Sequence, residues 1–102
     1  MQYQDFKDSL KADQPPSPIS QHLEALWWDA KGDWDKAHHI ADRVLSDTDA
    51  DWIHAYLHRK EGDSFNAGYW YRRANKPRFD GSLESEWQSL VRYFLDGQDI
   101  LK

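Results

Sequence analysis

The sequence predicts an all-α fold: a stack of two helical hairpins followed by a C-terminal capping helix. Apolar residues recur with a period near 3.6, which is typical of amphipathic helices. Gly32-Asp33 and Gly62-Asp63 interrupt that period, as helix-ending and helix-capping residues do. No segment shows the period of two that indicates a strand. With 102 residues, we expect one domain spanning residues 1–102.

The first expected elements are an N-terminal helix or arm, residues 1–14, and a first hairpin, residues 18–46. DQPPSP should end the N-terminal helix, because proline lacks an amide hydrogen and restricts the residue before it. We expect Ser17 to cap the next helix, with Pro18 at its first position. Gly32 should end that helix near residue 31, and Asp33 should cap a helix that runs to about residue 45.

The second hairpin is expected over residues 48–76 and the capping helix over residues 82–96. Thr48 or Asp49 should cap a helix from about 50 to 61, and Gly62-Asp63 should repeat the first turn. Ser82 should cap the last helix, and Gly97 should stop it.

A repeat of about 30 residues relates these units. At this offset Leu23, Ile53 and Leu83 share one position, and Trp27, Leu57 and Trp87 share another. Stacked hairpins bury apolar stripes that a single hairpin leaves exposed. We therefore expect these two rows to form one core across three parallel helices.

The segments AKGDWDKA and KEGDSFNAGYWYRRA resemble the turn and second helix of tetratricopeptide repeats. The matching positions are Gly32, Asp33, Trp34, Ala37 and Ala41, then Gly62, Asp63, Ala67, Tyr71 and Ala74. The resemblance implies a tetratricopeptide-like right-handed stack, although the period is shorter than the usual 34 or so and Ser64 replaces the aromatic residue. The chain also resembles a group of small uncharacterised bacterial proteins, which implies a bacterial origin and no activity.

The composition favours a non-catalytic protein of the cytoplasm. A net charge of −5 argues against nucleic acid as a partner, and the charged N-terminus argues against a signal peptide or membrane anchor. The chain has no cysteine, so thiolate chemistry is excluded. No nucleophile or phosphate-loop motif is present. We expect no cofactor and no catalytic residues.

The favoured function is a small scaffold or adaptor that binds an unknown protein or peptide, as a monomer or weak homodimer. Stacked first helices should form a concave, acidic groove suited to a segment with Lys or Arg and an apolar anchor. Its expected residues are Glu24, Trp28, Asp51, His54, Glu84 and Gln88. A second expected surface consists of Tyr69, Arg72 and Arg73, a composition enriched at interfaces.

The alternative function is a metal- or small-ligand-binding domain centred on His54 and His58. These residues are four apart, so both imidazoles can leave one helix face and bind a divalent ion. The competing interpretation is that His58 packs between hairpins and His54 forms a surface ion pair. His38 and His39 are adjacent, and at most one of them can join a site, because neighbouring helical residues point about 100° apart.

Overall fold

The computed structural model of the chain, which describes residues 1–44 and 46–100, is all-helical, as the sequence predicts. Within those residues there is no strand. The α-helices are α1 (Tyr3–Asp8), α2 (Gln21–Ala30), α3 (Trp34–His39), α4 (Thr48–Lys60), α5 (Ser64–Arg73) and α6 (Leu83–Ile100). A 3-10 turn at Ser9–Lys11 follows α1, and a π-helical segment at Ile40–Val44 continues α3.

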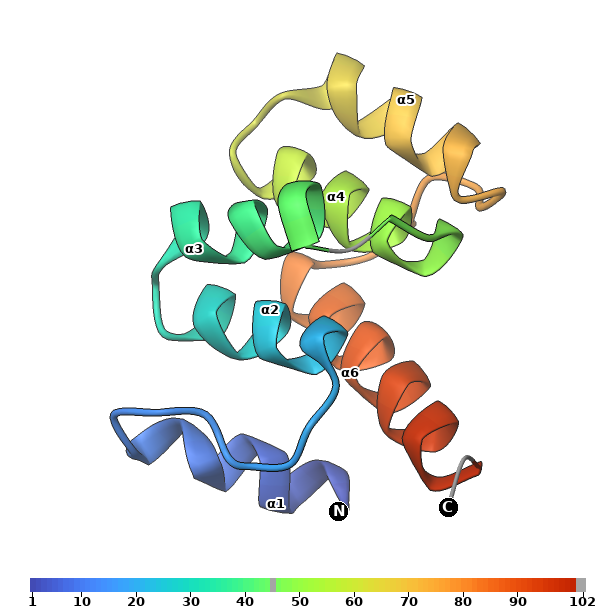
Figure 1. Cartoon of the computed structure of the whole chain (residues 1–102). Helices are drawn as coiled ribbons and strands as arrows, with labels where there is room; N and C mark the ends of the chain where they lie inside the picture. Colours follow the sequence, from blue (N-terminus) through green and yellow to red (C-terminus); the bar gives the residue numbers. More distant parts are fainter. Residues whose placement is uncertain (45, 101–102) are drawn as a thin grey trace.

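The helices pack as two hairpins that the last helix crosses. Helices α2 and α3 form the first hairpin, and α4 and α5 form the second, which lies above it in Figure 1. Helix α1 lies at the opposite end of the stack from α5. Helix α6 contacts both α2 and α4 and runs obliquely to them. Within the described ranges, no helix combines the length and apolar character that crossing a bilayer demands.

Both Gly-Asp turns have the conformation that the sequence predicts. Gly32 and Gly62 have φ values of 89° and 87°, in the left-handed region that side chains disfavour. Asp33 accepts a hydrogen bond from the backbone N–H of Lys36 at 3.0 Å, and Asp63 accepts one from that of Asn66 at 3.2 Å. These bonds satisfy amides that the first helical turn leaves without partners.

Two other predicted caps were wrong by one to three residues. Ser20, not Ser17, caps α2, because its hydroxyl accepts from the backbone N–H of Leu23 at 3.2 Å. Asp47, not Thr48 or Asp49, caps α4, because its carboxylate accepts from the backbone N–H of Ala50 at 2.7 Å. Each segment offers several residues able to cap, and only one of them meets the third amide of the helix.

The ends of two helices also differ from the prediction. Gly97 does not stop the last helix, which continues to Ile100. A glycine ends a helix by adopting positive φ, and Gly97 is not among the described residues with positive φ. In the first hairpin, α3 ends at His39, and the π-helical segment Ile40–Val44 replaces the α-helix expected there. Ser82 caps α6 as predicted, since its hydroxyl accepts from the backbone N–H of Ser85 at 3.0 Å.

The core contains most of the two predicted rows of residues. Leu23, Trp27, Ile53 and Leu57 are fully buried, and Trp87 is 8% exposed. Leu83, the last member of the first row, is only partly buried. The prediction that the last helix lies parallel to the first helices of the two hairpins was wrong, because α6 crosses α2 and α4 obliquely (Figure 1).

Two carboxylates lie inside this core, and both have partners. Glu86 on α6 is fully buried, and Asp29 on α2 is 2% exposed. Asp29 accepts from the Tyr56 hydroxyl and the Lys60 ammonium, each at 2.9 Å. Burial and the nearby Asp29 carboxylate raise the pKa of Tyr56, so its hydroxyl stays protonated and donates. These contacts tie α2 to α4 through hydrogen bonds in addition to apolar packing.

Candidate functional site

Three of the six residues expected to form a concave groove lie at two different cavities. Glu24 and Trp28 belong to α2, Asp51 and His54 belong to α4, and Glu84 and Gln88 belong to α6. Both α2 and α4 pack against α6. Asp51 and His54 line a cavity between the π-helical segment, α4 and α5. Glu84 lines a different cavity, beside Asp29, Lys60 and Trp87. The remaining three residues, Glu24, Trp28 and Gln88, line neither of these cavities.

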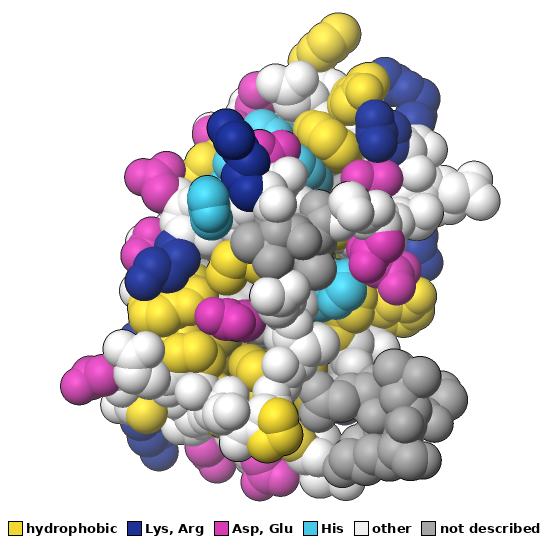
Figure 2. All heavy atoms as spheres, in the orientation of Figure 1, with side chains coloured by type: hydrophobic (Ala, Val, Ile, Leu, Met, Phe, Trp, Pro, Cys, Tyr) yellow, Lys and Arg dark blue, Asp and Glu magenta, His cyan; other side chains and the backbone are white. Residues whose placement is uncertain are grey.

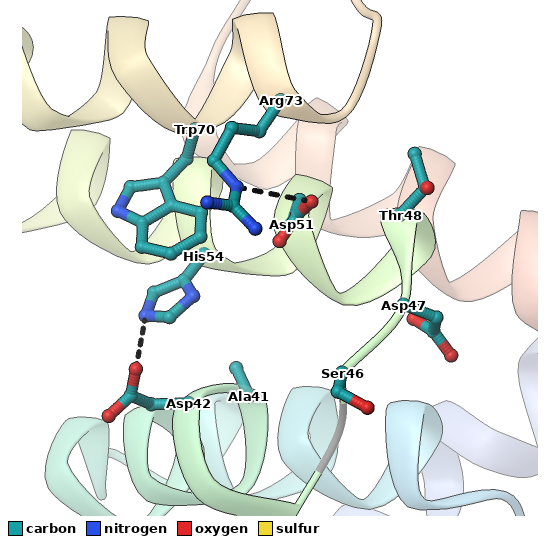
Figure 3. A pocket seen from close by; sticks show the side chains of 9 residues that line it. All are labelled: Ala41, Asp42, Ser46, Asp47, Thr48, Asp51, His54, Trp70 and Arg73. Atoms are coloured by element: carbon teal, nitrogen blue, oxygen red, sulfur yellow. Dashed lines mark ion pairs between the residues drawn. The ribbon is translucent and has the colours of Figure 1, made fainter.

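The cavity at Asp51 and His54 measures about 330 Å³ and combines residues from both predicted surfaces (Figure 3). Arg73 reaches it from α5, and its Nε lies 3.6 Å from the Asp51 Oδ2 atom. His54 Nε2 lies 3.7 Å from the Asp42 Oδ1 atom. Asp47 pairs with His22 at 3.0 Å. Asp42 also pairs with Arg43 at 3.2 Å, so each of these three carboxylates has a basic partner.

A cluster of three histidines, His38, His54 and His58, lies next to this cavity. His38 comes from α3, and the other two come from successive turns of α4. One ring nitrogen from each residue lies within 4.8 Å of the other two. The Nε2 atoms of His38 and His54 are 3.1 Å apart, so one must carry the proton and the other accept it. We call these three residues the histidine cluster.

Aromatic and acidic neighbours fix the orientation of the three rings. Trp34 stacks on His38 with ring centroids 4.7 Å apart, and Trp70 stacks on His54 at 3.8 Å. Figure 3 shows the Trp70 indole next to the His54 imidazole. The Nδ1 atom of His58 lies 2.7 Å from Glu61 Oε1.

Two of the three imidazoles are held in the neutral form. Burial, followed by the charge of His38, lowers the pKa of His54 to about 4. Burial, followed by the charge of His58, lowers the pKa of His38. His54 is only 3% exposed, so protonation would place a charge on a ring that has lost most of its hydration. Near neutral pH, each of these two rings therefore keeps one unprotonated nitrogen that can act as a metal ligand.

Acidification should destabilise the metal-free protein through His54. Its pKa is about 4 in the folded chain and ~6.5 when unfolded, so the unfolded chain binds more protons between these values. Stability is then complete above about pH 7 and falls by about 1–3 kcal/mol on acidification to pH 4. The charged or titratable groups that face His54 are His38, His58, Asp42 and Arg73. Urea unfolding in EDTA at several pH values measures this loss, and His54→Gln should remove most of it.

The sequence identified two members of the histidine cluster and missed the third. His54 and His58 were recognisable because they are four residues apart. His38 joins them from the first hairpin, whereas the adjacent His39 is exposed. The expectation that at most one of this pair can join a site agrees with this arrangement. Nothing in the local sequence distinguishes His38 from His39, because the choice depends on how α3 is rotated against α4.

The outer face of α5, formed by Phe65, Tyr69 and Arg72, is a second candidate site. Phe65 is 82% exposed and Tyr69 is 42% exposed, and Arg72 is also exposed. Their spacing places all three on one side of the helix. Figure 2 shows hydrophobic and basic side chains gathered at the top of the molecule, where Figure 1 places α5.

Basic side chains flank this α5 face. The Arg73 Nη1 atom donates to the Tyr69 hydroxyl at 3.2 Å. Arg78 lies over Gly68, where an added Cβ would collide with its guanidinium group, and it donates to Ser64 at 3.2 Å. The sequence pattern predicted Tyr69, Arg72 and Arg73 as a surface, and Phe65 was recognisable as the residue one turn before Tyr69.

No family model, no curated protein and no solved structure matches this chain.

Proposed function

We propose that the chain is a small, cytoplasmic, tetratricopeptide-like interaction module of bacterial origin that binds an acidic segment of a partner protein. The proposal assigns binding to the α5 face, and it involves no catalysis. The main observation in support of this function is the 82% exposure of Phe65 beside Tyr69. The two Gly-Asp turns and the packing of α2–α3 against α4–α5 support the tetratricopeptide-like frame.

The concave groove is less suited to this function than the α5 face. Helix α6, which carries two of the groove residues, crosses α2 and α4 obliquely and does not extend a row of parallel helices. His54, one of the groove residues, is buried. The α5 face needs no rearrangement before it can receive a partner.

Both the apolar and the charged parts of the α5 face indicate the chemistry of the partner. Clustered exposed aromatic residues are typical of interaction sites, and Arg and Tyr are enriched among residues that dominate binding energy. Arg72 and Arg78 give this face a positive charge, although the whole chain carries −5. An acidic segment with one apolar anchor would match it, whereas a Lys- or Arg-rich segment would be repelled.

A photo-crosslinking amino acid at position 65, introduced in the native host, tests the location. The partner should cross-link at position 65 and not at position 93. Tyr93, on α6, serves as the control because its 44% exposure is close to the 42% of Tyr69. With the captured partner purified, Arg72→Glu should weaken binding by about 10-fold or more, and the affinity should fall as salt rises. A charge-reversed partner segment should restore binding to Arg72→Glu. Cross-linking at position 93 alone, or an affinity that Arg72→Glu leaves unchanged, would contradict the proposal.

A further inference from the structure

We propose that His38, His54 and His58 bind a divalent transition-metal ion and so join the two hairpins. This site is separate from the α5 face and does not depend on partner binding. It uses the three residues of the histidine cluster as nitrogen ligands. The probe for it is Zn²⁺.

The distances within the histidine cluster suit such an ion. Zn–N bonds of about 2.0–2.1 Å in a tetrahedral site place ligand nitrogens about 3.3 Å apart. The Nε2 atoms of His38 and His54 are already 3.1 Å apart. One ring nitrogen of His58 lies within 4.8 Å of both, so the His58 side chain has to move closer to complete the site.

The neighbours of the cluster resemble those of metal-binding histidines. Glu61 Oε1 lies 2.7 Å from Nδ1 of His58, which leaves Nε2 of that ring for the ion. A carboxylate in this position fixes the tautomer of a metal-binding histidine and increases its basicity. Trp34 and Trp70 stack on the other two rings, so these imidazoles lose little further freedom on binding. Such prior ordering of ligands favours tight binding.

The ligand set favours late transition metals over Mg²⁺ or Ca²⁺. Three imidazoles suit Zn²⁺, Ni²⁺ or Cu²⁺, whereas the alkaline-earth ions require mostly oxygen ligands. Asp42 is placed to supply a fourth ligand, because its Oδ1 atom lies 3.7 Å from Nε2 of His54. The site would then have three nitrogen ligands and one carboxylate oxygen.

Binding would add a link between the two hairpins to the packing and the hydrogen bonds that already join them. His38 belongs to the first hairpin, and His54 and His58 belong to the second. An ion that binds only when the hairpins are docked stabilises the folded chain in proportion to the logarithm of its free concentration. The site would therefore act as a metal-dependent clasp between hairpins.

Isothermal calorimetry on the full chain, without a histidine tag and after EDTA treatment and dialysis, tests this site. Zn²⁺ should bind with a stoichiometry of one and raise the Tm. His38→Ala and His58→Ala should each weaken binding by about 10-fold or more, and Glu61→Gln by about 10-fold. His39→Ala is the matched control, because His39 is adjacent to His38 but exposed, and it should leave the affinity unchanged.

A measurement on the wild-type chain covers the case in which a variant fails to fold. Of the five histidines, Zn²⁺ should shift the ring ¹⁵N resonances of His38, His54 and His58 and leave those of His22 and His39 in place. His58, Glu61 and Asp63 form a second group with metal-binding spacing. Binding that survives in a folded His38→Ala chain would assign the ion to that group and overturn the proposal. The absence of both heat and a Tm change would overturn it as well.

Discussion

Replacing Trp87 with Ala is expected to lower the free energy of unfolding by about 3–5 kcal/mol, as for other large-to-small changes in a core. The indole lies where three helices meet. Its ring centroid is 6.1 Å from that of Phe6 and 6.2 Å from that of Tyr3, both on α1. Its Nε1 atom donates to the backbone carbonyl of Leu26 at 3.0 Å. The variant would therefore lose apolar contacts and one hydrogen bond that links α6 to the backbone of α2.

Urea unfolding followed by circular dichroism measures this change. Natural domains of this size have about 5–15 kcal/mol of stability, so the variant should be marginally folded at 25 °C. Phe65→Ala is the matched control, because Phe65 is 82% exposed and its removal should change stability by less than about 0.5 kcal/mol. If Trp87→Ala unfolds at the same urea concentration as the control, α6 does not pack as described.

Replacing Glu86 with Ala should lower the free energy of unfolding by a similar amount, about 3–5 kcal/mol, for an electrostatic reason. The buried carboxylate accepts hydrogen bonds from Arg59 at 2.8 Å, from the Trp52 indole at 3.2 Å and from the Tyr71 hydroxyl. Burial and the hydrogen bond to Glu86 raise the pKa of Tyr71, so this hydroxyl remains a donor. Removing the carboxylate would leave the Trp52 and Tyr71 donors without this acceptor and would remove the charged partner of Arg59, which keeps its hydrogen bond to the Gly81 carbonyl.

Glu84→Ala provides the control for Glu86→Ala. Glu84 lies two residues earlier on the same helix and is exposed, so its loss should change stability by about 0.5 kcal/mol or less. Glu86→Gln should be intermediate, because the amide keeps the shape and one acceptor oxygen but not the charge that pairs with Arg59. Equal midpoints for the Glu84 and Glu86 variants in urea would show that the buried network contributes little.

Features that depend on contacts within a few residues could be predicted from the sequence alone. Gly32 and Gly62 end helices because only glycine adopts positive φ at low cost. Asp33, Asp63 and Ser82 cap helices through bonds to amides three residues further on. These local rules, together with the apolar period, were sufficient for the all-α class and the positions of both hairpin turns. They failed at Ser20 and Asp47, where several nearby residues could cap equally well.

The way in which the helices meet could not be predicted from these local rules, and the candidate sites depend on it. The apolar stripe of α6 would allow this helix to pack either parallel to α2 and α4 or obliquely. In the oblique arrangement of the structure, Glu86 is buried against Arg59. His38, and not its neighbour His39, reaches His54 and His58 because of the way α3 is rotated against α4. The sequence of α3 does not specify this rotation. Periodicity specifies which face of a helix is apolar. The crossing angle is instead set by side-chain packing between residues that are distant in the chain.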